Sequence, residues 1–215
     1  MDIALNTRKA NVLFNPGAEI NRIAETHYFI RLELRKALDG FVLSDYAKSV
    51  LGGNATYLEY WEKSFSDRFF DMGTLIRLGT SIENCLKYFY MDQKGYGNIA
   101  QLKNSCEYSK GIFQRIQAWQ QNGVIALYQR ELGVDLTQNP HLVEIQELML
   151  HRHLYAHCSG IVDDDYIYDI LRTTGQDLQQ LPELSSYPNQ ETYFFEPLKR
   201  LNDFIEATRG FFAKF

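Results

Sequence analysis

Apolar residues recur every three or four positions along the longest segments of this chain, which is the spacing of one face of an α-helix. Residues 140–157 show the pattern after a predicted helix start at Asn139 and Pro140. Their apolar positions are Leu142, Ile145, Leu148 and Met149. The sustained period-two alternation that indicates strands is nearly absent. The sequence therefore predicts an all-α protein that folds as a helical bundle.

The remaining helices are predicted from the same spacing and from glycine and proline breaks. They cover residues 18–38, 44–51, 66–91, 98–104, 110–121, 124–132, 163–171 and 196–212. Residues 55–65 are rich in aromatic side chains that suit core packing, and residues 174–192 read as a loop. A chain of 215 residues can bury one sizeable core. We expect a single domain over 1–215, with a helical extension at 1–62 and a core at 63–215.

Charge and cysteine content limit the classes of function. The net charge of −5 argues against broad electrostatic binding to nucleic acid, although a local basic site, or one assembled across a dimer, remains open. Three widely spaced cysteines without a C-x-x-C pair favour reduced thiols and a cytoplasmic location. The N-terminus lacks the pattern of a signal peptide, and no apolar run approaches the roughly 20 residues that span a membrane. No membrane partner is expected.

Two opposite charges fall on apolar helical stripes. On a helical wheel Arg152 lies about 20° from Ile145, and Glu83 lies about 20° from Ile76 and from Tyr90. A charge that points into a core is costly unless it has a partner or lines a cleft. We therefore expect Glu83 and Arg152 to contact each other.

Three interpretations compete for residues 151–165. In the first, the histidines and Arg152 are polar groups at the C-terminal end of a helix, where cations interact well with the helix dipole. In the second, His153 and His157 bind a metal together with Cys158 or with the acids at 163–165, although the sequence lacks the Glu of H-E-x-x-H. In the third, a histidine that transfers protons near pH 7 and an arginine that stabilises charge act on a phosphate.

At this point the residues resemble a known family, the HEPN superfamily. Arg152-His153-x-x-x-His157, followed by Gly160-Ile161-Val162-Asp163, resembles the family's R-φ-x-x-x-H motif, whose second position is usually polar. The segment from Leu78 to Lys87 resembles the earlier HEPN helix, which commonly carries an acidic residue facing the motif, here Glu83. The similarity covers residues 75–91 and 141–171, and the final helix in outline.

The resemblance implies a HEPN-type bundle and a metal-independent endoribonuclease without a cofactor, in which the ribose 2′-OH attacks the adjacent phosphate. By position, His157 would transfer protons, Arg152 would hold the phosphate, His153 would support them, and Glu83 would orient Arg152. RNA would be the substrate, often bound between two copies of the chain. Arg152 and His157 lie about 140° apart on one helix, which also favours a homodimer joined near 152–160.

Family members serve as toxins of toxin–antitoxin systems, with an antitoxin protein as partner, or as effectors of abortive infection and antiviral defence. Others have lost cleavage and only bind, so two expectations stay open. One is a ribonuclease that acts as a bacterial toxin or defence effector. The other is a non-catalytic HEPN-like helical module that contacts RNA, a nucleotide or an antitoxin.

Overall fold

The computed structural model of the chain describes residues 16–39, 67–105, 123–178, 185–186, 192–194 and 196–214. Nearly all of these residues lie in helices. The helices are α1 (Pro16–Asp39), α4 (Asp67–Lys94), α5 (Ile99–Lys103), α7 (Val124–Leu132), the 3₁₀ helix η3 (Leu136–Gln138), α8 (Leu142–Cys158), α9 (Asp164–Thr174), α10 (Glu196–Lys199) and α11 (Leu201–Phe212). Two two-residue strands, β1 (Ser185–Ser186) and β2 (Thr192–Tyr193), pair antiparallel. The all-α prediction is confirmed.

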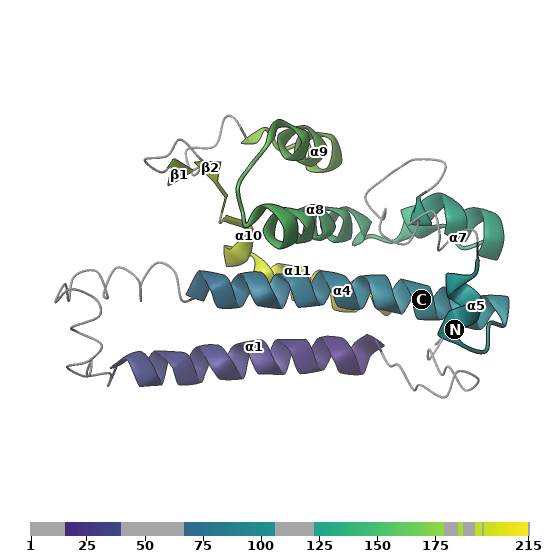
Figure 1. The fold of residues 1–215 in the computed structure, drawn as a ribbon, viewed down its shortest axis with the longest axis horizontal. Coiled ribbons are helices and arrows are strands. Elements are labelled where there is room, and N and C mark those ends of the chain that lie inside the picture. The colour runs from purple at the N-terminus through teal and green to yellow at the C-terminus, as the bar shows by residue number, and fades with distance from the viewer. Residues whose placement is uncertain are drawn as a thin grey trace.

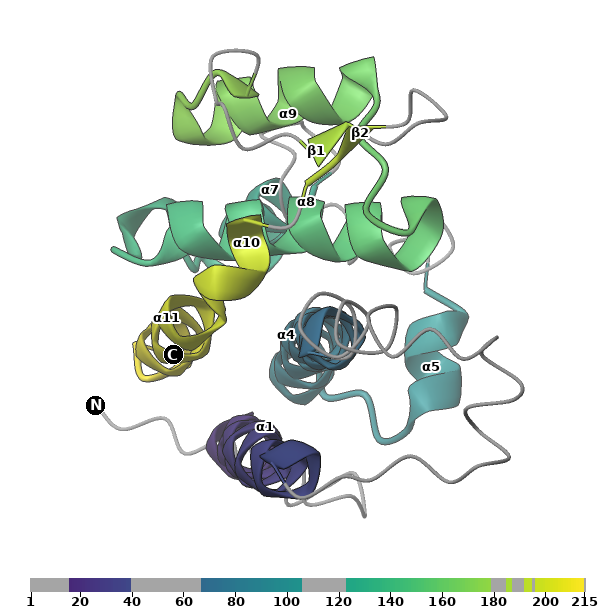
Figure 2. The ribbon, with the colours of Figure 1, turned by 90° about the vertical axis from the view of Figure 1, so that its left-hand side faces the viewer.

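The long helix α4 lies at the centre of the molecule (Figure 1). It packs against α1 on one side and against α8 on the other, while α11 contacts α1, α4 and α8. Figure 2 looks nearly along α1, α4 and α11 and shows α8 lying across them, with α9 on the outer side of α8. The segment at 140–157 is therefore held between α9 and the central helices.

One continuous core joins these layers. The apolar stripe of α8 is buried as predicted, and the stripe of α4 contributes Leu75, Leu78, Ile82 and Leu86. Ile20 and Ile23 of α1 belong to the same core, so part of the expected N-terminal extension packs with the rest of the bundle. The expected boundary at 62–63 and the helices predicted at 44–51 and 110–121 lie outside the described residues, as do the aromatic residues of 55–65.

Helix boundaries differ from the predictions by a few residues, with one larger correction. The final helix was expected to run unbroken from 196–197 to 212, but it breaks at Arg200, which separates α10 from α11. The Arg200 backbone N–H bonds to the Pro197 carbonyl, and its side chain turns towards α8, as described below. At the other breaks Gly95, Gly133 and Gly175 end their helices with positive φ, the conformation that glycine adopts most readily.

Candidate functional site

Arg152 and Glu83 meet where α8 crosses α4. The Arg152 Nη2 atom lies 3.8 Å from Glu83 Oε1, so the predicted contact is present as an ion pair. The Glu83 side chain is almost fully buried, whereas that of Arg152 keeps 22% of its surface exposed. A second cation, Lys87, lies one turn further along α4 and brings its Nζ to 3.9 Å from Glu83 Oε2. Two cations therefore share one buried carboxylate, and the net charge of the three side chains is +1.

The ion pair leaves hydrogen-bonding capacity unused. Arg152 Nε and Glu83 Oε1 are buried, and neither has a hydrogen-bond partner in the described part of the chain. A separation of 3.8 Å also exceeds hydrogen-bond length. Buried polar atoms without partners are uncommon in folded proteins and call for an explanation such as a functional site. The pair thus holds the guanidinium in place without using up its donors.

Gly79 permits the close approach of Arg152. A Cβ atom at this position would lie 2.8 Å from Arg152 Cγ and 3.1 Å from Arg152 Cβ. Both atoms lie close to the backbone of α8, so a larger residue would require the Arg152 side chain or α8 itself to shift. The glycine was part of the segment from Leu78 to Lys87 that carried the family resemblance, but its role follows only from the structure.

His153 and His157 lie side by side on the exposed face of α8. Their ring centroids are 4.7 Å apart, as expected for positions one helical turn apart, and both residues are exposed. Within one chain they do not face the same direction as Arg152, which packs into α4. Arg152 and His157 therefore lie on different sides of α8, as their spacing in the sequence predicts.

The end of α8 is shaped by backbone that turns left-handed. Ser159 has φ 54° and Gly160 has φ 88°, and the Ser159 and Gly160 N–H groups both bond to the Leu154 carbonyl. Ser159 is the one non-glycine residue with positive φ among those described. Asp163 is the N-cap of α9, and its side chain accepts a hydrogen bond from the Tyr166 N–H.

His151 has a role that the sequence analysis missed. It was grouped with the polar residues at the helix end, but it is fully buried and bonded on both ring nitrogens. The Tyr166 hydroxyl lies 2.5 Å from Nδ1, and Nε2 lies 3.3 Å from Glu147 Oε1. Burial lowers the pKa of His151 and so favours the neutral ring. In the neutral ring Nδ1 accepts a hydrogen bond from the Tyr166 hydroxyl and Nε2–H donates one to the Glu147 carboxylate, so both ring nitrogens have partners.

Glu147 completes this buried network with Arg200. Two guanidinium nitrogens of Arg200 approach its two oxygens at 2.6 and 3.3 Å. Burial would raise the pKa of the Glu147 carboxyl, but its hydrogen bonds to His151 and Arg200 outweigh burial and lower it. The carboxylate therefore stays charged and joins α8 to the junction of α10 and α11. The i, i+4 spacing of Glu147 and His151 was the signal in the sequence that could have indicated this pair.

The metal interpretation gains no third ligand. Among the residues that the structure describes, no group of three or more His, Cys, Asp or Glu side chains is placed to hold a metal ion. His153 and His157 lie together, but Cys158 and the acids at 163–165 do not join them.

No described helix is long and apolar enough to cross a membrane.

Comparison of the chain with models of known protein families, with curated proteins and with solved structures found no match. The geometry of α4 and α8 therefore carries the functional argument.

Proposed function

We propose that the chain is a metal-independent endoribonuclease of the HEPN type, whose reacting groups lie at the C-terminal end of α8. The observation that carries the proposal is the setting of Arg152. Glu83 pairs with its guanidinium, and Gly79 leaves room for the side chain to pack closely against α4. The side chain remains partly exposed, and Nε has no hydrogen-bond partner among the described residues. A fixed arginine of this kind suits a phosphate that gains negative charge in the transition state.

The exposed pair of histidines supports the same chemistry. Cleavage of RNA by its own 2′-OH needs a base for that hydroxyl, an acid for the leaving 5′-oxygen and positive charge near the phosphate. His157 would perform proton transfer, and His153, at 4.7 Å between ring centroids, would support it. Arg152 would stabilise the phosphate, and Glu83 would be a positioning residue that orients Arg152. The reaction yields a 2′,3′-cyclic phosphate and a free 5′-hydroxyl.

The site proposed here is formed by two copies of the chain. Arg152 points into α4, whereas His157 lies on the exposed face about 140° away on the helix. A two-fold axis near 152–160 would bring Arg152 of one protomer towards His157 of the other, and symmetric dimers are the commonest assembly of this kind. The resemblance extends the proposal to a cytoplasmic bacterial toxin or antiviral effector, with an antitoxin as a further partner.

The test is cleavage of single-stranded RNA by the purified chain in EDTA, with the matching DNA as control because DNA lacks the nucleophile. Arg152→Ala and His157→Ala should each lower the rate at least about a hundredfold, the order expected for loss of a charge-stabilising or acid–base group. Arg172→Ala is the matched control, since Arg172 is an exposed arginine on α9 that pairs with nearby Asp169. Folded variants that cut as fast as the parent would place the site elsewhere.

Mixing the two inactive variants tests the shared site. A heterodimer of Arg152→Ala and His157→Ala protomers contains one site with both residues intact if the site spans the two-fold axis. Activity should then return to part of the parental level. No recovery in a mixture shown by native mass spectrometry to contain heterodimers would refute the shared site.

One observation favours a second candidate, a non-catalytic HEPN-like binding module. Within a single chain Arg152 and His157 diverge, so a chain that does not dimerise lacks a complete site. Such a protein would bind RNA, a nucleotide or an antitoxin without cutting. Saturable RNA binding by a folded chain that yields no cyclic phosphate would favour this candidate over the enzyme.

A further inference from the structure

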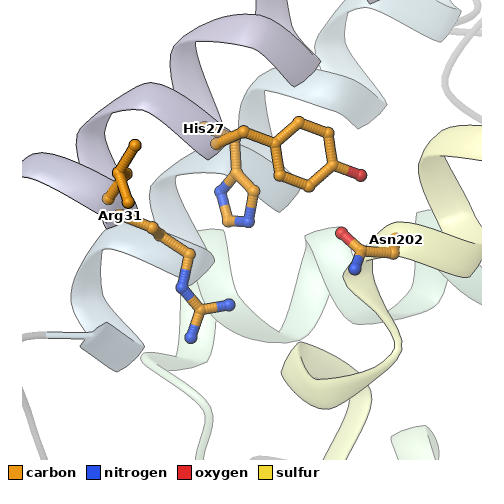
Figure 3. A pocket seen from close by; sticks show the side chains of 5 residues that line it. His27, Arg31 and Asn202 are labelled. Carbon is orange, nitrogen blue, oxygen red and sulfur yellow. The ribbon is translucent and has the colours of Figure 1, made fainter. Parts of the chain in front are cut away.

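A small cavity opens between α1 and α11, among residues that the preceding sections do not use. Its volume is about 260 Å³, and it is lined by His27, Tyr28, Arg31 and Leu32 of α1 and by Asn202 of α11. Figure 3 shows His27, Arg31 and Asn202 arranged around this space. The side chains come from two helices that are far apart in the sequence but packed together in the fold.

The polar wall of the cavity rests on a buried cluster. His27 is 1% exposed, and its Nδ1 lies 3.2 Å from the Thr74 hydroxyl of α4. Asp71, also buried, lies 3.9 Å from His27 Nδ1 and 3.7 Å from a nitrogen of Arg31. Asp71 is not among the residues that line the cavity, and its carboxylate pairs with the Arg31 guanidinium. Arg31 is thus positioned in advance, which lowers the entropic cost of binding a ligand.

The lining carries one full charge, and that charge is positive. Among the described residues that line the cavity, Arg31 carries this charge and none is an acid. A guanidinium has five N–H donors and matches the geometry of carboxylate and phosphate groups. The Asn202 amide adds a donor, and the neutral His27 ring can present its Nε2–H while Nδ1 accepts from the Thr74 hydroxyl. Together these groups can surround an oxyanion.

The opposite wall is apolar and open. Tyr28 and Leu32 are 45% and 54% exposed, so both side chains are accessible to a ligand. An aromatic ring and an isobutyl group beside a cation suit a ligand with both an anionic group and an apolar body. The volume is below the roughly 300–1,000 Å³ typical of sites for drug-sized ligands, so the ligand must be small.

We propose that this cavity is a binding site for a small organic anion, in which a phosphate or carboxylate group contacts Arg31, Asn202 and His27 while a short apolar or aromatic body lies against Tyr28 and Leu32. The site is separate from Arg152 and His157 and does not depend on the proposed ribonuclease activity. Its ligand would be a metabolite-sized molecule and not a polymer.

Isothermal titration calorimetry with the full chain tests the site with four probes. Phenyl phosphate carries both parts of the ligand, inorganic phosphate only the anion, phenol only the ring, and benzoate a carboxylate in place of the phosphate. We expect phenyl phosphate or benzoate to bind more tightly than either inorganic phosphate or phenol. Whichever of the two binds more tightly identifies the anionic group.

Variants assign the binding to the cavity. Arg31→Gln should weaken the best probe at least about tenfold, the size expected for loss of a charged hydrogen bond. Arg22→Gln is the matched control, because Arg22 is a largely exposed arginine of the same helix that pairs with Glu19, and it should leave binding unchanged. Asn202→Ala should weaken binding about threefold to tenfold. Leu32→Ser should weaken phenyl phosphate but not inorganic phosphate.

Asn202 and Leu32 are exposed, so these two variants keep the proposal testable even if Arg31→Gln disturbs the buried cluster. Absence of saturable binding of every anionic probe up to about 10 mM would overturn the proposal. So would binding that is equally strong for phenol, or that survives Arg31→Gln, Asn202→Ala and Leu32→Ser alike in folded protein.

Discussion

Replacement of Glu83 by alanine should destabilise the protein by about 3 kcal/mol. Two cations lie 3.8 and 3.9 Å from the Glu83 carboxylate. At an effective dielectric constant of about 20, one such contact corresponds to an attraction of about 4 kcal/mol before desolvation is counted. Loss of one partner of a buried pair usually costs about 3–5 kcal/mol, since it strands the other charge. Arg152 and Lys87 keep 22% and 17% of their side-chain surface exposed, so solvent recovers part of the loss.

The measurement is unfolding in urea, followed by circular dichroism, with a thermal melt alongside. A loss of about 3 kcal/mol should lower the melting temperature by roughly 6–12 °C for a chain of this size. Glu206→Ala is the matched control, because Glu206 pairs with Arg209 but its side chain is 62% exposed. Exposed pairs contribute only about 0–1 kcal/mol, so this variant should stay close to the parent.

A double-mutant cycle isolates the contact itself. Arg152→Met keeps an apolar side chain of similar length, and Glu83→Ala combined with Arg152→Met should cost clearly less than the two single changes taken separately. The coupling energy should be about 1–3 kcal/mol. If the two changes simply add, or if Glu83→Ala costs no more than Glu206→Ala, the reasoning about the buried pair is wrong.

Two further predictions follow from buried positions. Gly79→Ala places a Cβ 2.8 Å from Arg152 Cγ and should lower the free energy of unfolding by about 1–3 kcal/mol through overpacking. Gly73→Ala on the same helix meets nothing within 4 Å and should raise it by up to about 1 kcal/mol in the same denaturation assay. Equal effects of the two changes would contradict the close packing of Arg152 against Gly79. Burial, together with the nearby charge of Arg31, lowers the pKa of His27 from 6.5 to about 4. Between these two pH values the unfolded chain binds more protons than the folded chain, so the free energy of unfolding falls as the pH drops from about 6.5 to about 4. The loss is roughly 3 kcal/mol at most. His27→Gln should flatten the dependence measured by urea unfolding across this range, and an unchanged slope would refute the assignment.

The sequence predicted the parts of the fold that depend on one helix at a time. The apolar stripe of 140–157 and the helix at 163–171 could be predicted from local sequence, and both are present. The contact between Glu83 and Arg152 could be predicted because each charge lies on an apolar stripe, where isolation would be costly. The proposed catalytic roles of Arg152, His153, His157 and Glu83 stay predictions.

What could not be predicted depends on contacts between distant segments. His151 and His153 look equivalent in the sequence, yet one is buried in a hydrogen-bonded network and the other is exposed. The difference comes from Tyr166 and from Arg200, which is 53 residues from Glu147. The break at Arg200 has no glycine to mark it. The cavity at His27 likewise forms only when α1 and α11 pack together.

The buried charges on α8 have a consequence for the face that bears His153 and His157. The apolar stripe fixes which side of α8 faces the core, but apolar contact is non-directional and sets the rotation of the helix less exactly than a polar contact does. Ion pairs and hydrogen bonds are directional, and α8 has them on two sides, with Arg152 fixed to α4 and Glu147 fixed to Arg200. A rotation by one residue, about 100°, would break both attachments. The direction in which the two histidines point is therefore set in part by Arg152 and Glu147, through contacts that the histidines do not make themselves.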